Sequence, residues 1–238
     1  MINIKLNLRK VVAIAICLAG FGIGSNAQLT SIQNGGYWEV YNFNGQKVTN
    51  GRAEKIAEDE DWYNVENGGY WEVYTSKGKK VTNGKAEKTG NWYNVQNSGY
   101  WEVYNSSGKK ITNGRSESVG DWYNVQNGEN WEVYDSNERK IIVGRAESVG
   151  DWYNVQNSGY WAVYNSSGQK IFNGRAEKAG DWYNVQNGQH WEVYNSSGKK
   201  ITNGRAEKAS GAFYNVLNSG YWEVYNSNGQ KVSNGRMQ

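Results

Sequence analysis

The chain has 238 residues, of which 37% are hydrophobic, 14% aromatic and 21% charged, with 30 Gly, no Pro and one Cys. This composition excludes a charge-rich disordered chain and a disulfide-stabilised scaffold. Three of the 26 basic residues and none of the acidic ones lie in the first 27 positions, which leaves 23 basic residues to balance 23 acidic residues. A neutral body gives no electrostatic reason to expect a nucleic acid or an anionic membrane as partner.

Residues 1–27 have the pattern of a secretory signal peptide. A basic start that includes Lys5 precedes an apolar run at residues 11–23, and small residues lead to Ala27. The apolar run is about 13 residues long, whereas a membrane-spanning helix needs about 20, so a transmembrane anchor is the less favoured alternative. We expect cleavage before Gln28, no membrane span after processing, and a secreted or cell-surface protein, bacterial periplasmic or extracellular.

Residues 28–238 are predicted to form a single repeat domain of seven β units. A Tyr-Trp-Glu-Val-Tyr motif recurs with tryptophan spacings of 33, 30, 30, 30, 30 and 31 residues. A second motif, Trp-Tyr-Asn-Val, precedes most copies. Such a fixed period is typical of repeat architectures, in which each unit packs on its neighbours. We number the repeats by the tryptophan of the first motif, which is Trp38, Trp71, Trp101, Trp131, Trp161, Trp191 and Trp222.

Alternating side chains and turn residues predict four antiparallel strands in each repeat. In the third repeat these strands are residues 92–96, 100–105, 109–112 and 115–118. Residues 97–99 and 106–108 fit three-residue hairpin loops, and Asn113-Gly114 fits a two-residue type I′ turn. That turn would place Lys110 opposite Glu117. The alternative is one continuous strand through Gly114, which gives three strands per repeat.

The predicted register gives each repeat one apolar face and one polar face that is rich in aromatic residues. In the third repeat the apolar face carries Tyr93, Val95, Trp101, Val103, Ile111 and Ser116. A unit of this size cannot bury such a face alone, so neighbouring units must stack on it. We therefore predict an all-β fold of seven tandem ~30-residue antiparallel β-hairpin units in an elongated array, with a closed seven-bladed propeller as the alternative.

The sequence Gly-Tyr-Trp-Glu-Val-Tyr-Asn-Ser-Ser-Gly-Lys-Lys-Ile-Thr-Asn-Gly at residues 99–114 resembles the MORN-type repeat, specifically its bacterial antitoxin-like variant. The shared positions are Trp101, Tyr104, Gly108 and Gly114. The pattern is also similar, more loosely, to the hairpins of choline-binding cell-wall repeats. Both resemblances imply serial β-hairpins and leave the ligand open. The 30-residue period and the Trp-Tyr-Asn-Val strand depart from both families.

The sequence offers no singular catalytic or metal site. His190 is the only histidine, and Cys17 lies inside the predicted signal peptide. Histidine triads, thiol catalysis and metal sites held by cysteine or by several histidines are therefore excluded from the mature chain. The recurring glutamates occupy equivalent positions, whereas a catalytic carboxylate pair needs two different environments. We expect a protein that is not an enzyme and has no cofactor.

The candidate ligand-binding residues are aromatic side chains on the predicted polar face. Flat aromatic rings beside Asn, Gln and Glu can stack on sugar rings, and repetition would add avidity for a polymer. The alternative is that these aromatic side chains pack against neighbouring strands. The candidates are Trp62, Trp92, Trp122, Trp152, Trp182, Tyr70, Tyr100, Tyr160 and Tyr221.

These features lead to two hypotheses for function. The first is a secreted, non-catalytic repeat protein that binds a surface polymer, an extracellular or cell-wall polysaccharide, through many equivalent sites. The second is a self-associating extracellular structural or fibre component, because the repeats are rich in Asn, Gln and Gly and lack Pro.

The fourth repeat departs from the common turn sequence. Glu138 stands where the other repeats have the turn glycine. A non-glycine residue in a left-handed turn conformation costs about 1 kcal/mol, so we expect Glu138→Gly to stabilise the protein.

Overall fold

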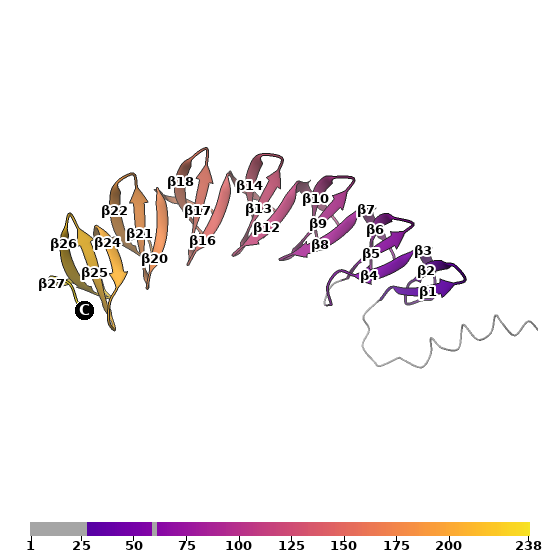
Figure 1. Cartoon of the computed structure of the whole chain (residues 1–238), viewed down its shortest axis with the longest axis horizontal. Helices are drawn as coiled ribbons and strands as arrows, with labels where there is room; N and C mark the ends of the chain where they lie inside the picture. Colours follow the sequence, from indigo (N-terminus) through magenta and orange to yellow (C-terminus); the bar gives the residue numbers. More distant parts are fainter. Residues whose placement is uncertain (1–27, 59–60) are drawn as a thin grey trace, which may run out of the picture. The chain divides into compact units, whose positions relative to one another are not determined.

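The computed structural model describes residues 28–58 and 61–238, and the predicted signal peptide lies outside these ranges (Figure 1). Every element of regular structure in the described residues is a β-strand, and every strand pairing is antiparallel. The predicted all-β fold of seven tandem antiparallel units is therefore confirmed. The chain divides into two compact units between Asn83 and Gly84, which we call unit 1 and unit 2.

Unit 1 contains two sheets whose strands follow chain order. The three-stranded sheet consists of β1(Thr30–Asn34), β2(Tyr37–Tyr41) and β3(Lys47–Asn50). The four-stranded sheet consists of β4(Arg52–Lys55), β5(Trp62–Asn67), β6(Tyr70–Thr75) and β7(Lys80–Asn83).

Unit 2 contains five four-stranded sheets, each again in chain order. The first sheet consists of β8(Lys85–Thr89), β9(Trp92–Asn97), β10(Tyr100–Asn105) and β11(Lys110–Asn113). The second consists of β12(Arg115–Val119), β13(Trp122–Asn127), β14(Asn130–Asp135) and β15(Lys140–Val143). The third is β16(Arg145–Val149), β17(Trp152–Asn157), β18(Tyr160–Asn165), β19(Lys170–Asn173). The fourth is β20(Arg175–Ala179), β21(Trp182–Asn187), β22(His190–Asn195) and β23(Lys200–Asn203). The fifth is β24(Arg205–Lys208), β25(Phe213–Asn218), β26(Tyr221–Asn226) and β27(Lys231–Asn234). Figure 1 shows these five sheets in a row rather than in a ring, and consecutive sheets contact one another.

The four predicted strands exist in the first six repeats, but the fourth strand of each of these repeats joins the next sheet. β12 pairs with β13, so that Glu117 lies opposite Asn124, and it does not return to β11. The predicted pairing of Lys110 with Glu117 is therefore wrong. Lys110 instead forms an ion pair with Glu102 in the adjacent strand β10.

Gly114 makes the crossing from one sheet to the next, and Asn113-Gly114 is not a hairpin turn. Its φ is 113°, a conformation that favours glycine, and its amide donates to the carbonyl of Trp101 at 2.8 Å. A Cβ atom at this position would lie 2.4 Å from the carbonyl oxygen of Gln126 in the next sheet. The close approach of two sheets therefore requires glycine here.

The two true hairpins of each repeat have different loops. Asn97 pairs with Tyr100, so the first loop has two residues, and Ser98 and Gly99 have φ values of 49° and 88°. This is the geometry of a type I′ turn, not the predicted three-residue loop. The second loop is residues 106–108, as predicted, because the Asn105 amide donates to the carbonyl of Lys109 at 3.0 Å. A bulge follows this loop: Tyr104 pairs with Lys110, whereas Val103 pairs with Thr112, so the register shifts by one residue between them.

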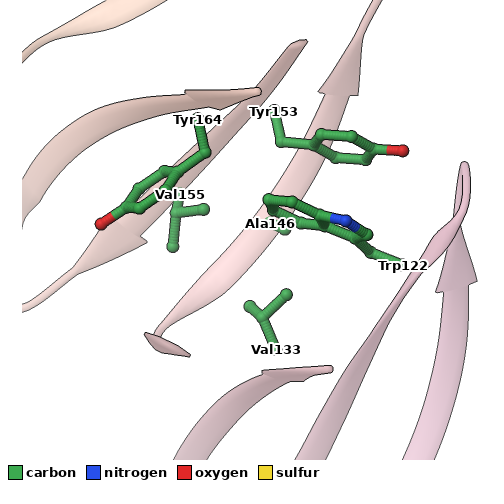
Figure 2. Packing of buried hydrophobic residues seen from close by; sticks show 6 residues of the cluster. All are labelled: Trp122, Val133, Ala146, Tyr153, Val155 and Tyr164. Atoms are coloured by element: carbon green, nitrogen blue, oxygen red, sulfur yellow. The ribbon is translucent and has the colours of Figure 1, made fainter. Parts of the chain in front are cut away.

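The core lies between successive sheets, and a stacked aromatic pair dominates each interface of unit 2. Trp122 of β13 stacks on Tyr153 of β17 with ring centroids 3.8 Å apart and planes 11° apart. Figure 2 shows this pair together with Val133, Ala146, Val155 and Tyr164. Aromatic pairs contribute about 0.5–1.5 kcal/mol beyond the area that they bury. The hydroxyl of Tyr153 also accepts a hydrogen bond from the Asp121 amide at 3.0 Å, which ties the two sheets together.

The inner strands are buried on both faces, so the predicted division into one core face and one solvent face is only partly correct. In the third repeat Tyr93, Val95 and Val103 are buried as predicted, whereas Trp101 is half-buried. Trp92 and Asn94, which were expected on the polar face, are also buried. Within unit 2, the three middle sheets therefore have a neighbouring sheet on either side of their inner strands.

Candidate functional site

The structure places the five candidate tryptophans in the core rather than on a binding surface. Their exposed fractions are only 1 to 2%. The expectation of an outer line of tryptophans is therefore wrong, because stacking of successive sheets covers the face that a single repeat would leave open. The residues concerned are Trp62, Trp92, Trp122, Trp152 and Trp182.

The four candidate tyrosines, in contrast, are exposed. Tyr160 is 82% exposed, and Tyr70, Tyr100 and Tyr221 are 78 to 80% exposed. Each is the first residue after a two-residue turn, where its strand begins. Tyr37 of the first repeat is equally exposed, at 80%, and sequence reasoning left it out although it begins the same Tyr-Trp-Glu-Val-Tyr motif.

In unit 2 the exposed tyrosines stand beside recesses that recur along the repeats. The recess of the fifth repeat has a volume of about 960 Å³, and those of the third and seventh have about 690 and 660 Å³. The fifth-repeat recess is formed by the turn before Tyr160, the crossing at Gly174 and the turn of the following sheet at residues 186–188. Its lining therefore combines aromatic rings with amide groups.

In unit 2 an arginine lies over the tryptophan of each Tyr-Trp-Glu-Val-Tyr motif and forms an ion pair with a glutamate. The guanidinium of Arg175 lies 4.9 Å from the ring centroid of Trp161, and its Nη2 lies 2.8 Å from Glu147 Oε1. A cation over an indole face contributes about 0.5–1 kcal/mol at an exposed site. The same three residue types meet at the other crossings between sheets of unit 2 and again after its last strand. Sequence reasoning missed this arrangement, because the arginine and the glutamate come from two successive sheets.

A second recurring group on the strands of the repeats consists of one glutamate, one lysine and one tyrosine. In the third repeat Glu102 pairs with Lys110, and the hydroxyl of Tyr104 donates to Glu102 Oε2 at 2.8 Å. The hydrogen bond from Lys110, followed by that from Tyr104, lowers the pKa of the Glu102 carboxyl. The glutamate is therefore charged and already occupied at neutral pH, which fits a structural role better than acid catalysis.

The surface can bind by stacking and hydrogen bonding. Among residues 28–58 and 61–238, no group of three or more His, Cys, Asp or Glu side chains is placed to hold a metal ion. No helix in the part of the chain that the structure describes is long and apolar enough to cross a membrane.

Comparison with known proteins gives no family. No family model and no curated protein matches the chain. Among solved structures, Hsv2p of Kluyveromyces lactis is similar with a TM-score of 0.28 and 10% identity over 88% of this chain and 94% of that one. Apo AztD from Citrobacter koseri has a TM-score of 0.25 and 10% identity over 89% and 82% of the two chains. Similarities at this level do not assign a fold or an activity to this chain.

Proposed function

We propose that the protein is a secreted, non-catalytic repeat protein that binds a surface glycan through its exposed tyrosines and the recesses beside them. The observation that carries the proposal is the recurrence of one polar and aromatic recess at equivalent positions of unit 2. Sugar rings stack on flat aromatic faces, and the adjacent asparagines and glutamines can bond hydroxyl groups. Weak equivalent sites on one chain act together on a polymer, which raises the overall avidity.

The tyrosines are better candidates than the half-buried tryptophans. Tyr100 and Tyr160 present exposed rings, whereas arginines lie over the rings of Trp101 and Trp161. A ligand that covers an exposed ring removes apolar surface from contact with water, which favours binding. We therefore assign the stacking role to Tyr70, Tyr100, Tyr160 and Tyr221, with Tyr37 added.

The test is retention of the mature protein on a panel of insoluble polysaccharides and cell walls, followed by a glycan array. The variant Tyr100→Ala/Tyr160→Ala should lower the affinity for the retaining polymer by about tenfold or more, which corresponds to about 1.4 kcal/mol. Phe43→Ala is the matched control, because Phe43 is 59% exposed but lies in the second hairpin loop, at the other end of its strand pair. Retention on no polymer, or equal loss in the Phe43 variant, would refute the proposal.

A further inference from the structure

The fifth repeat lacks a carboxylate that the six other repeats have. Ala162 in β18 occupies the position of the glutamate in Tyr-Trp-Glu-Val-Tyr. In the preceding repeat that glutamate is Glu132, which pairs with Lys140 and accepts a hydrogen bond from the Tyr134 hydroxyl at 2.7 Å. The same pairings occur in the other repeats that have the glutamate.

The loss leaves Lys170 without an acidic partner. Tyr164 and Lys170 lie directly opposite each other in β18 and β19, as Tyr134 and Lys140 do in the sheet before. Among the described residues Lys170 forms no ion pair, and its side chain lines the fifth-repeat recess. The recess therefore contains a cation whose usual counter-charge is missing.

Tyr164 has lost two hydrogen-bond partners. The first is the absent glutamate. The second is the threonine of the preceding repeat, which bonds the equivalent tyrosine elsewhere: the Tyr225 hydroxyl lies 3.2 Å from Thr202 Oγ1. The residue at the corresponding position for Tyr164 is Ile142, and both line the recess.

The Tyr164 hydroxyl consequently has no hydrogen-bond partner in the described part of the chain, although the residue is only 8% exposed. Figure 2 shows this hydroxyl pointing away from the stacked rings of Trp122 and Tyr153. Burial raises the pKa of Tyr164, so the phenol keeps its proton and remains a donor at neutral pH. In the described residues every fully buried side-chain nitrogen or oxygen has a hydrogen-bond partner, so the unpartnered Tyr164 hydroxyl reaches solvent and is free to donate to a ligand.

We propose that the fifth-repeat recess binds the carboxylate of an acidic sugar, in the place that the glutamate side chain fills in the other repeats. Lys170 Nζ and the Tyr164 hydroxyl supply the two contacts, and the exposed ring of Tyr160 is placed to stack on the sugar. The recess is also larger than that of the third repeat, where Glu102 forms part of the lining, at about 960 against 690 Å³. This inference rests on the proposed glycan binding and adds to it one subsite, in the fifth repeat, that recognises an acidic sugar.

The experiment is an NMR titration of the mature chain with three probes: galacturonate, its neutral counterpart galactose, and acetate. We expect galacturonate to shift the amide signals of residues 160–171 and to bind at least tenfold more tightly than galactose. Acetate should shift the same signals more weakly if the carboxylate is the shared chemistry and the sugar ring adds contacts. Equal binding of galactose and galacturonate, or equal binding of acetate and galacturonate, would overturn the assignment to an acidic sugar.

Two reciprocal variants provide the controls. Ala162→Glu restores the common sequence, and its carboxylate should lower galacturonate affinity at least tenfold by occupying Lys170 and Tyr164. Glu102→Ala should create a second galacturonate response at residues 100–111 in the third repeat. An Ala162→Glu variant that binds galacturonate unchanged would overturn the inference. If the protein is then still retained on a neutral polysaccharide, and if this retention depends on Tyr100 and Tyr160, the proposed glycan binding stands and only the acidic subsite fails. The two failures are therefore distinguishable.

Discussion

Asn124 in β13 holds the backbone of Ala146 in the next sheet through two hydrogen bonds. Its Nδ2 donates to the Ala146 carbonyl oxygen at 2.9 Å, and its Oδ1 accepts from the Ala146 amide at 2.7 Å. The side-chain amide thus acts like the backbone of an extra strand between two sheets that are not otherwise hydrogen-bonded in a ladder. The same pair of bonds joins every pair of successive sheets in unit 2.

We predict that Asn124→Ala lowers the free energy of unfolding by about 3 kcal/mol, because it leaves a buried donor and a buried acceptor unpaired at about 1–3 kcal/mol each. Urea denaturation measures the loss, and hydrogen exchange at the Ala146 amide should accelerate. Asn127→Ala is the control, since Asn127 is exposed at the end of the same strand. Equal losses in the two variants would show that the inter-sheet bonds contribute little.

This asparagine shows where the sequence is insufficient. The repeat period, the strands and the two antiparallel hairpins of each repeat could be predicted, because they depend on side-chain alternation and on turn residues, although the loop length of the first hairpin could not. Asn94 and Asn124 alternate with apolar residues and therefore look like solvent-facing positions. They become core residues only because a second sheet packs on that face. The sequence of one repeat does not show how closely the next sheet packs against it.

The prediction of a hairpin turn at Asn113-Gly114 is wrong for a related reason. Asn-Gly is the preferred sequence of a type I′ turn, and the same glycine conformation also serves a crossing between sheets. The exposed tyrosines could be predicted as candidate site residues, whereas the recess could not, because its walls come from turns of successive repeats. The singular character of Ala162 was visible as a sequence exception, but its meaning required the Lys-Glu-Tyr geometry.

We predict that Gly114→Ala destabilises the protein by more than about 3 kcal/mol. The new methyl group would lie 2.4 Å from the backbone oxygen of Gln126, so two sheets must move apart in addition to the strain of a positive φ. Gly99→Ala is the matched control: its φ is also positive, at 88°, but no atom lies within 4 Å of the added carbon. We expect a cost of about 1 kcal/mol there. Thermal and urea denaturation of the pair would refute the sheet-crossing assignment if the two costs were equal.

The stacked tyrosines should make the fold sensitive to alkali. Burial is the main cause that raises the pKa of both Tyr153 and Tyr183 above the ordinary value of 10.0. A group whose folded pKa is raised contributes stability that is fully present below its unfolded pKa and is lost as the pH rises toward the folded pKa. We therefore expect the free energy of unfolding to fall as the pH rises above about 10.

The variant Tyr183→Phe isolates one of these groups. It should be less stable than the wild type at pH 8, because the Asp151 amide loses the oxygen that lies 3.0 Å away, but its stability should fall less steeply between pH 9.5 and 11.5. Tyr160→Phe, which is 82% exposed in the wild type, is the control. Urea denaturation across this pH range would contradict the argument if the Tyr183 variant retained the full wild-type slope.

The turn at Glu138 combines strain with a compensating contact. Its φ of 66° confirms that a non-glycine residue occupies the left-handed position expected from the sequence. The side chain, however, accepts a hydrogen bond from Asn105 Nδ2 at 2.5 Å and pairs with Lys109 Nζ at 3.0 Å in the preceding sheet. The contact with Asn105, followed by that with Lys109, lowers the pKa of the Glu138 carboxyl.

These two effects oppose each other, so the simple gain expected for Glu138→Gly should largely cancel. Glycine relieves about 1 kcal/mol of backbone strain but removes a partly exposed ion pair and hydrogen bond of about the same value. Glu138→Ala keeps the strain and loses the contact, so it should be about 1 kcal/mol less stable than both the wild type and the glycine variant. The wild-type advantage over the alanine variant should be present above the ordinary glutamate pKa, decrease as the pH falls through the lowered pKa of Glu138, and shrink in 1 M salt. Urea denaturation of the three proteins at pH 7 and pH 3 tests this order, and an alanine variant as stable as the glycine variant would show that the positive φ carries no cost at this turn.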